Sequence, residues 1–332
     1  MRLLVTGGCG FIGSNFIRVV LSGHGEDEVL NLDKLTYAGN PENLSDMEGN
    51  PRYEFLRGDI CDEGDIRKAF DWGPDAVLNF AAETHVDRSI TSPGAFVHTD
   101  VIGTYGLLER SREKGVRFIQ ISTDEVYGSI EEGSFREDSP FQPNSPYAAS
   151  KASADMLVRS YVRTYGIDAV VVRSSNNYGP YQYPEKVIPL FVTNLLEGKK
   201  VPLYGEGKNV RDWLFVEDNC RAIELVLRSG VPGEAYNVGA GQERTNLELT
   251  RAILNIMGMG EESIRYVADR PGHDLRYSVD SSRLRELGWR PEYDFERGLR
   301  MTVEWYRDRR EWWQPIKSGE FRRYYLEKYG DI

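Results

Sequence analysis

Short, continuously apolar segments alternate with longer amphipathic stretches in the first half of the chain. Apolar runs of four or five residues are typical of strands buried on both faces, and the stretches of helical period between them are typical of crossover helices. The pattern therefore predicts an α/β fold with a doubly wound parallel sheet covered by helices on both faces. The expected strands cover residues 3–5, 29–32, 53–56, 76–80, 118–121 and 169–172, and the first helix covers 11–21.

The alternation ends at a turn-rich aromatic connection, Tyr178 to Pro184. A helix is predicted at 187–196, helical patterns dominate from about residue 245, and a short strand is expected near 264–267. Segments 210–216 and 235–238 are predicted to return to the first sheet. The predicted domains are a dinucleotide-binding domain over 1–178 with a return segment near 209–238, and a smaller, mostly helical substrate domain over 179–208 and 239–332.

Composition narrows the classes of function. The 332 residues suffice for one large or two fused domains, and no run of ~18 apolar residues suggests a membrane span. The net charge of −11 argues against nucleic acid or an anionic membrane as the main partner. An acidic protein can still bind an anionic ligand through a local basic pocket.

The cysteines and histidines indicate neither a disulfide framework nor a metal site. Cys9, Cys61 and Cys220 are odd in number and far apart, and the 4 histidines do not cluster at ligand spacing. The first apolar run begins almost at Met1, so we expect no signal peptide. Together these features predict a cytoplasmic protein. Trp312 and Trp313 are interpreted as packing residues, with a lipid or partner anchor as the alternative.

A glycine-rich turn follows the first predicted strand directly and opens the first helix. Gly7, Gly10 and Gly13 recur at spacing three, which permits a tight turn and the close approach of a pyrophosphate to the helix N-terminus. Asp33 closes the second strand, where a carboxylate accepts hydrogen bonds from the ribose hydroxyls of NAD and repels the extra phosphate of NADP. The neighbouring Lys34 weakens that preference. The sequence therefore predicts a Rossmann-type NAD site.

Three further residues belong to this prediction. Asp59 and Ile60 follow the third strand and are candidates for the adenine edge, with helix capping as the alternative role of Asp59. Cys9 is expected to face the phosphates, as a small residue that the turn tolerates rather than a redox group.

Tyr147 and Lys151 lie four residues apart at the start of a predicted helix and share one face. An ammonium beside a phenol is expected to lower the pKa of the phenol, which can then accept a hydroxyl proton while hydride leaves the same carbon. Thr123 ends the fifth strand and can orient that hydroxyl. Asp124 and Glu125 follow it, and this adjacent acid pair predicts a second reaction beyond hydride transfer, with capping of the next turn as the alternative.

The sequence resembles the extended short-chain dehydrogenase/reductase family, in its nucleotide-sugar dehydratase branch. The resemblance spans roughly residues 2 to 300, and Cys9 and Thr84 depart from residues usual in the family. The matching motifs are S-T-D-E-V-Y-G at 122–128, A-A-E-T-H-V-D-R-S at 81–89, N-N-Y-G-P-Y-Q at 176–182, P-E-K at 184–186, V-R-D-W at 210–213 and R-P-G-H-D-L-R-Y at 270–277.

The resemblance implies dehydration of dTDP-glucose to a 4-keto-6-deoxy sugar with bound NAD. Tyr147 would take the proton of the 4-hydroxyl as C4 gives hydride to NAD, Glu125 would remove the C5 proton, and Asp124 would protonate the leaving 6-hydroxyl. Hydride would then return to C6. Two alternatives stay open: a UDP-sugar 4-epimerase or decarboxylase of the same fold, and a non-catalytic dinucleotide sensor.

The resemblance also implies the contacts and the assembly. Members of the family pair through the helices near 95–114 and 147–165, so a homodimer is expected. The implied cofactor contacts are Gly7, Gly10, Phe11, Ile12, Gly13, Asp33, Lys34, Asp59, Ile60, Ala81, Ala82, Thr99, Tyr147, Lys151 and Asn177. The implied substrate contacts are Thr84, Thr123, Asn176, Lys186, Pro202, Leu203, Tyr204, Arg211, Asn246, His273 and Arg276.

Overall fold

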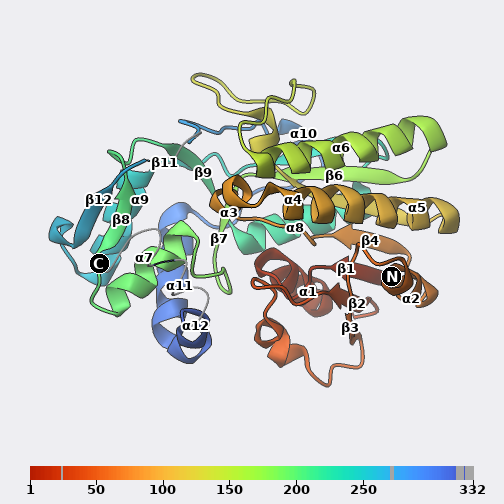
Figure 1. Cartoon of the computed structure of the whole chain (residues 1–332), viewed down its shortest axis with the longest axis horizontal. Helices are drawn as coiled ribbons and strands as arrows, with labels where there is room; N and C mark the ends of the chain where they lie inside the picture. The colour runs from red at the N-terminus through yellow and green to blue at the C-terminus, as the bar shows by residue number, and fades with distance from the viewer. Residues whose placement is uncertain (24, 270–272, 319–324, 326–332) are drawn as a thin grey trace.

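A seven-stranded parallel sheet forms the larger part of the molecule (Figure 1). The structure is a computed structural model, and it describes residues 1–23, 25–269, 273–318 and 325. The strands run in the order β10-β6-β5-β4-β1-β2-β3, so the predicted doubly wound sheet is confirmed. Their bounds are β1 Arg2–Thr6, β2 Glu28–Asp33, β3 Tyr53–Arg57, β4 Ala76–Asn79, β5 Arg117–Thr123, β6 Ala169–Ser174 and β10 Ala235–Val238.

Helices cover both faces of this sheet because successive strand residues point to opposite sides. Leu3 and Val5 of β1 are fully buried in one apolar cluster with α1 (Phe11–Gly23) and α8 (Val216–Ser229). Leu4 lies in a second cluster on the other face, formed with helices α2 (Glu63–Asp71), α5 (Thr104–Lys114) and α6 (Pro146–Tyr165). Burial on both faces explains why the central strands β1 and β4 are mostly apolar.

A smaller part lies beside the sheet, on the left in Figure 1. It has its own apolar core, which includes Tyr178, Trp213 and the fully buried Trp313, so the packing interpretation of Trp313 is confirmed. Its elements are β7 Asn176–Tyr178, α7 Val187–Leu196, β8 Val201–Tyr204, β9 Val210–Phe215, β11 Glu243–Thr245, α9 Asn246–Met257, β12 Ile264–Val267, α11 Phe295–Asp308 and α12 Arg310–Ile316.

One strand prediction is wrong in its partner. Strand β9 does not return to the large sheet but pairs with β7 and β11 in a separate three-stranded sheet. The edge of the large sheet beside β6 is already occupied by β10, whose Ala235 pairs with Val171. The expected strand at 264–267 does form, as β12 beside β8.

The remaining elements are short and connect these layers. Residues 128–145 form turns and irregular segments and hold one isolated bridge, Phe135 to Val279. The short elements are η1 Pro41–Met47, α3 Val86–Thr91, α4 Pro93–Phe96, the π-helical η2 Val97–Gly103, η3 Asp124–Tyr127, η4 Glu261–Ser263 and α10 Ser282–Glu286. Within the described ranges, no helix combines the length and apolarity needed to cross a bilayer.

Candidate active site

A cavity of about 310 Å³ opens at the carboxyl ends of the large sheet. The strand order reverses between β1 and β4, and this switch point is where doubly wound sheets bind their ligands. The predicted residues that line the cavity are Gly7, Gly10, Phe11, Ile12, Gly13, Asp33, Lys34, Asp59, Ile60, Ala81, Ala82, Thr84, Thr99, Thr123, Asp124, Glu125, Tyr147, Lys151, Asn176, Asn177 and Lys186.

The glycine turn has no room for a side chain at Gly7 or Gly13. Gly7 has a φ of 68°, and a Cβ there would lie 2.6 Å from the backbone nitrogen of Ala81. A Cβ on Gly13 would lie 2.6 Å from the carbonyl oxygen of Gly7. The turn is therefore a bare-backbone cradle in front of the α1 N-terminus, and this geometry fits the diphosphate of a dinucleotide.

Asp33 is held at the end of β2 by backbone donors. One carboxylate oxygen accepts from Cys9 N at 2.9 Å and the other from Leu35 N at 2.8 Å, while burial raises the pKa of Asp33. The ammonium of Lys34 pairs with Asp59 at 2.6 Å, which raises the pKa of Lys34 and lowers that of Asp59. Lys34 is therefore neutralised by a carboxylate beside the predicted ribose position. Helix α2 is capped by Asp62, so the capping alternative for Asp59 is wrong.

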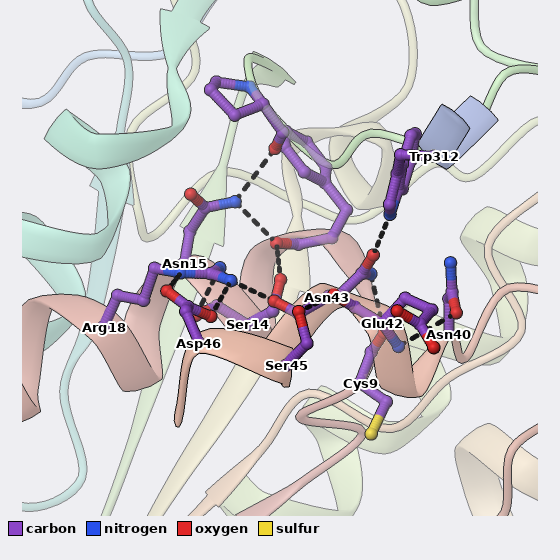
Figure 2. A network of polar contacts seen from close by, with 12 residues as sticks. Cys9, Ser14, Asn15, Arg18, Asn40, Glu42, Asn43, Ser45, Asp46 and Trp312 are labelled. Atoms are coloured by element: carbon purple, nitrogen blue, oxygen red, sulfur yellow. Dashed lines mark hydrogen bonds and ion pairs between the residues drawn. The ribbon is translucent and has the colours of Figure 1, made fainter. Parts of the chain in front are cut away.

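Cys9 does not face the cavity, and the expectation that it meets the phosphates is wrong. Its side chain is 1% exposed and packs in the core under α1, where Sγ accepts from Asn31 Nδ2 at 3.3 Å. Burial and the nearby Asp33 raise the pKa of the thiol to about 12, so it stays protonated. Cys9 contributes to the turn through its backbone. Its carbonyl oxygen accepts hydrogen bonds from Asn40 N at 3.0 Å and from Asn43 Nδ2 at 2.9 Å (Figure 2).

Tyr147 and Lys151 occupy the first two turns of α6, as predicted. The helix begins here because Ser145 caps it, accepting from Ala148 N at 3.1 Å, and Pro146 takes the first helical position. Lys151 Nζ donates to the carbonyl of Ile121 at 2.6 Å, and Tyr147 is hydrogen-bonded to the side chain of Thr123. These two hydrogen bonds join the first turns of α6 to the end of β5.

The expected lowering of the Tyr147 pKa is wrong for this structure. The pKa is raised well above its ordinary value, first by burial and then by the negative charges of Glu125 and Asp100. The hydrogen bond from Thr123 acts in the opposite direction without compensating. Tyr147 therefore has to lose its proton before it can act as a base, and the Thr123 side chain lies beside it.

Asp124 is buried in the turn that follows β5. Thr123 Oγ1 lies 3.2 Å from Asp124 Oδ1, and burial together with the charge of Glu125 raises the pKa of Asp124 to about 8. Thr123 caps this turn by accepting from Glu125 N at 3.3 Å, so neither acid is its N-cap. One protonated carboxyl beside a second carboxylate is the arrangement needed for paired acid and base chemistry.

Several buried polar atoms around the cavity have no hydrogen-bond partner among the described residues. They are Ser122 Oγ, Asp124 Oδ2, Ser175 Oγ, Asn176 Oδ1 and Asn177 Oδ1. Buried polar groups are normally hydrogen-bonded, so these atoms mark the part of the cavity lining that fits a polar ligand. Ser122 and Ser175 were missed by the sequence analysis, although each lies at or just after the carboxyl end of a predicted strand.

Comparison with known proteins places this geometry in a family. The model of a family described as GDP-mannose 4,6 dehydratase matches residues 4–302. The dTDP-glucose 4,6-dehydratase of Streptomyces niveus is 56% identical over 326 residues, covering 96% of this chain and 97% of that protein. The same-named protein of Neisseria meningitidis is 48% identical, with 99% of both chains covered. The chain belongs to the dTDP-glucose 4,6-dehydratase family.

A solved structure of the family superimposes closely. The dTDP-glucose 4,6-dehydratase of Streptomyces venezuelae, crystallised with NAD and TYD bound, has a TM-score of 0.93 and 55% identity, covering 96% of this chain and all of that one. The likeness confirms the predicted family and the Rossmann-type fold.

In this family member, a second group of side chains closes the cavity near α3 and α7. Lys186 Nζ donates to the carbonyl of Thr84 at 2.7 Å, so the two predicted substrate contacts touch. The sequence analysis missed Glu185, which lines the cavity, accepts from the Tyr37 hydroxyl at 3.1 Å and pairs with Arg88 at 3.4 Å. Burial raises the pKa of Glu185.

The other predicted substrate contacts of this family member lie outside the cavity lining. Arg211 lies over the ring of Tyr277 at 4.2 Å, and its charge lowers the pKa of Asp124, which places it near the site. Arg276 is paired with Glu243 at 2.7 Å. The residues outside the lining are Pro202, Leu203, Tyr204, Arg211, Asn246, His273 and Arg276, and their binding roles stay predictions.

Proposed function

We propose that this protein dehydrates dTDP-glucose to dTDP-4-keto-6-deoxyglucose, acting as an NAD-dependent hydro-lyase. The observation that carries the proposal is the raised pKa of Asp124, about 8, which supplies a protonated carboxyl at neutral pH directly beside Glu125. Hydride transfer alone needs no such acid. The relatives named as dTDP-glucose 4,6-dehydratases support the same conclusion.

The chain's own residues would bind the cofactor through the glycine turn and Asp33. When bound, NAD supplies a hydride acceptor for the sugar carbon C4 and later a hydride donor for C6. In its ionised form, Tyr147 accepts the proton of the 4-hydroxyl. The resulting ketone acidifies the C5 proton, which Glu125 removes, and Asp124 protonates the 6-hydroxyl so that the C6–O bond breaks and water leaves. C5 regains a proton as C6 is reduced.

This sequence leaves a proton imbalance that Thr123 can correct. Each turnover adds one proton to Tyr147 and takes one from Asp124, so moving one proton between them restores both groups. Thr123 is hydrogen-bonded to Tyr147, and its Oγ1 lies 3.2 Å from Asp124. A hydroxyl both donates and accepts, which supports a relay role in addition to orienting the substrate.

Product analysis tests the function. Purified protein is incubated with dTDP-glucose and UDP-glucose in parallel, and products are identified by mass spectrometry and NMR, with Tyr147→Phe as an inactive control. A 4-keto-6-deoxy product from dTDP-glucose is expected. Conversion of UDP-glucose to UDP-galactose without dehydration would contradict the proposal and favour the epimerase alternative, which does not require the Asp124–Glu125 pair.

The proposed assembly is a homodimer, formed through the face that carries α5 and α6. These helices lie side by side in Figure 1. Six of the exposed apolar side chains among the described residues lie on them and on the adjoining α3 and η2. Those side chains are Ile90, Val97, Ile102, Tyr105, Met156 and Tyr165, each at least 45% exposed. Apolar exposure of this kind is typical of protein interfaces. Ultracentrifugation should give twice the chain mass, and Ile102→Glu should give monomer.

We propose that the larger and the smaller part of the molecule bind different ligands. Strand β9 belongs to the smaller part by its packing, because Trp213 and Phe215 lie in that core. Residues 1–178 with 216–238 would therefore bind the cofactor, and 179–215 with 239–332 would bind the nucleotide. A cytoplasmic location stays a prediction from the cysteine pattern.

A further inference from the structure

Tyr127 is a fully buried tyrosine in the same short turn, η3, as Asp124 and Glu125. Its side chain is 0% exposed and does not line the active-site cavity. The hydroxyl donates to Asn237 Oδ1 at 2.8 Å and accepts from Arg173 Nη1 at 2.6 Å. The turn that carries the two acids is therefore tied to two strands of the large sheet, β10 and β6.

The partners of the Tyr127 hydroxyl are themselves fixed in the core. Arg173 is 6% exposed, and its Nε pairs with Asp155 Oδ2 of α6 at 2.8 Å. Its Nη1 also donates to the carbonyl of Glu137 at 3.0 Å. Separating a buried ion pair is strongly destabilising, so Arg173 offers the hydroxyl a fixed point of attachment. Asn237, the second partner, is fully buried in β10.

Aromatic side chains from the loop that follows η3 pack against the Tyr127 ring. Its centroid lies 5.2 Å from that of Phe135, with the ring planes 19° apart, and 5.7 Å from that of Phe141 in an edge-on contact. A phenylalanine at position 127 would keep both ring contacts and lose only the hydroxyl. The role of the hydroxyl can therefore be tested apart from that of the ring.

The two acids need such an attachment because they lie beyond the sheet. The pairing of β5 with β6 ends at Thr123 and Ser174, one residue before Asp124. Asp124 and Glu125 follow in a single 3₁₀ turn, whose hydrogen-bond geometry is poorer than that of an α-helix. The Tyr127 side chain links this turn to the rigid sheet.

The residues that act with the cofactor are held by other contacts. Tyr147 and Lys151 lie on α6, whose first turn is capped by Ser145, and Lys151 Nζ donates to the carbonyl of Ile121 at 2.6 Å. None of these contacts is made by Tyr127. Loss of the Tyr127 hydroxyl should therefore displace the acid pair more than it displaces Tyr147 and Lys151.

We propose that Tyr127 is a positioning residue for the loss of water, and that its buried hydroxyl sets the placement of Asp124 and Glu125 at the sugar. The proposal rests on the proposed function, because it concerns the two acids assigned to C5 and to the 6-hydroxyl. Both acids must meet neighbouring atoms of the sugar at once, and a misplacement of about 1 Å can cost about a hundredfold in rate. Oxidation at C4 makes no such demand on them.

The variant Tyr127→Phe tests the proposal on dTDP-glucose that carries deuterium at the sugar C4 or C5. Rates are expressed per NAD-loaded site, so that a loss of folded protein does not enter. Turnover should fall by about tenfold to a hundredfold. Deuterium at C5 should slow the variant further, because breaking that bond limits its rate, whereas deuterium at C4 should leave its turnover nearly unchanged.

Tyr236→Phe is the matched control. Tyr236 is also a buried tyrosine, 2% exposed, and its hydroxyl accepts from Val231 N at 3.0 Å. It precedes Asn237 in β10 and does not line the cavity. This variant loses a comparable hydrogen bond and should keep the turnover and the isotope effects of the wild type. A second variant, Asn237→Ala, removes the acceptor of the Tyr127 hydroxyl and should show the C5 effect with a smaller loss of rate.

The outcomes separate this proposal from the proposed function. If the wild type forms the 4-keto-6-deoxy product but Tyr127→Phe keeps the wild-type turnover, shows no effect of deuterium at C5 or is slowed mainly by deuterium at C4, this proposal is overturned and the proposed function stands. An equal loss of turnover in Tyr236→Phe overturns it as well. If the wild type forms no such product, both proposals fail. If Tyr127→Phe does not fold by circular dichroism, Asn237→Ala decides by the same isotope effects.

Discussion

The indole nitrogen of Trp312 donates a hydrogen bond to Asn43 Oδ1 at 2.9 Å, joining the C-terminal helix α12 to the segment after β2 (Figure 2). The amide of Asn43 donates in turn to the carbonyl of Cys9 at 2.9 Å. Arg18 of α1 donates to the carbonyl of Asn43 and pairs with Asp46. Helix α12, which lies late in the chain, therefore helps to hold the glycine turn near its start through Asn43.

Trp312→Phe should speed the loss of bound NAD. The substitution keeps the ring contact with Tyr181, whose centroid lies 5.9 Å away, but removes the donor to Asn43. A lost hydrogen bond of about 1 kcal/mol corresponds to roughly fivefold faster cofactor dissociation. The measurement is the rate of NAD release after gel filtration. Trp305→Phe serves as the control, because the Trp305 ring lies 4.7 Å from Tyr181 and its indole has no hydrogen bond among the described residues. Equal release from both variants would contradict the prediction.

The fall in kcat at alkaline pH should reflect the loss of the proton from Asp124. A proton-donating Asp124 is present below its pKa of about 8 and is lost as the pH rises through that value, so kcat should fall above about pH 8. Asp124→Asn removes the acid and should lower kcat by about a hundredfold or more. The residual activity should show no limb near pH 8. If the kcat of Asp124→Asn still falls above about pH 8, the fall is due to another group.

The same substitution should stabilise the fold. The pKa of Asp124 is raised on folding, so the native state binds a proton that the unfolded chain releases, and stability falls as pH rises between the unfolded value and about 8. Asp124→Asn removes this penalty. At pH 8 the free energy of unfolding should rise by at least about 1 kcal/mol, the equivalent of one pKa unit. Urea unfolding at pH 4 and pH 8 checks this, because the gain should be small at pH 4.

The features that the sequence predicted are those set by local pattern. The buried strands, the first helix and the start of α6 each follow from a continuous apolar run, a glycine turn or a Ser-Pro cap. The Asp124–Glu125 pair could be found because both acids follow a strand end directly. Gly7 and Gly13 could be found because a bare backbone at both positions is a steric requirement of the turn.

The features that the sequence missed depend on partners far along the chain. Strand β9 has the pattern of a buried strand, but its partner was decided by β10 occupying the edge of the large sheet. The side chain of Cys9 turns inward, where Asn31, 22 residues later, donates a hydrogen bond to its Sγ in the core. The pKa of Tyr147 is set by the charges of Glu125 and Asp100, which only the fold brings beside it.

Removing the hydroxyl of Thr123 should separate the first turnover from the later ones. In Thr123→Val, Asp124 begins protonated, so one round of water loss can occur, but the proton gained by Tyr147 no longer has a hydroxyl through which to return. A burst of about one product per site followed by slow turnover is therefore expected, and rapid-quench analysis of product measures it. Small buffer acids and bases should speed the slow phase by carrying the proton.

Thr123→Ser is the control for that experiment, because it keeps the hydroxyl and loses only a methyl group. It should turn over without a burst. If Thr123 only orients the substrate, Thr123→Val should slow the first turnover as much as the later ones, and buffer should have no effect. A uniform slowing of that kind would remove the relay while leaving Tyr147, Asp124 and Glu125 in their proposed roles.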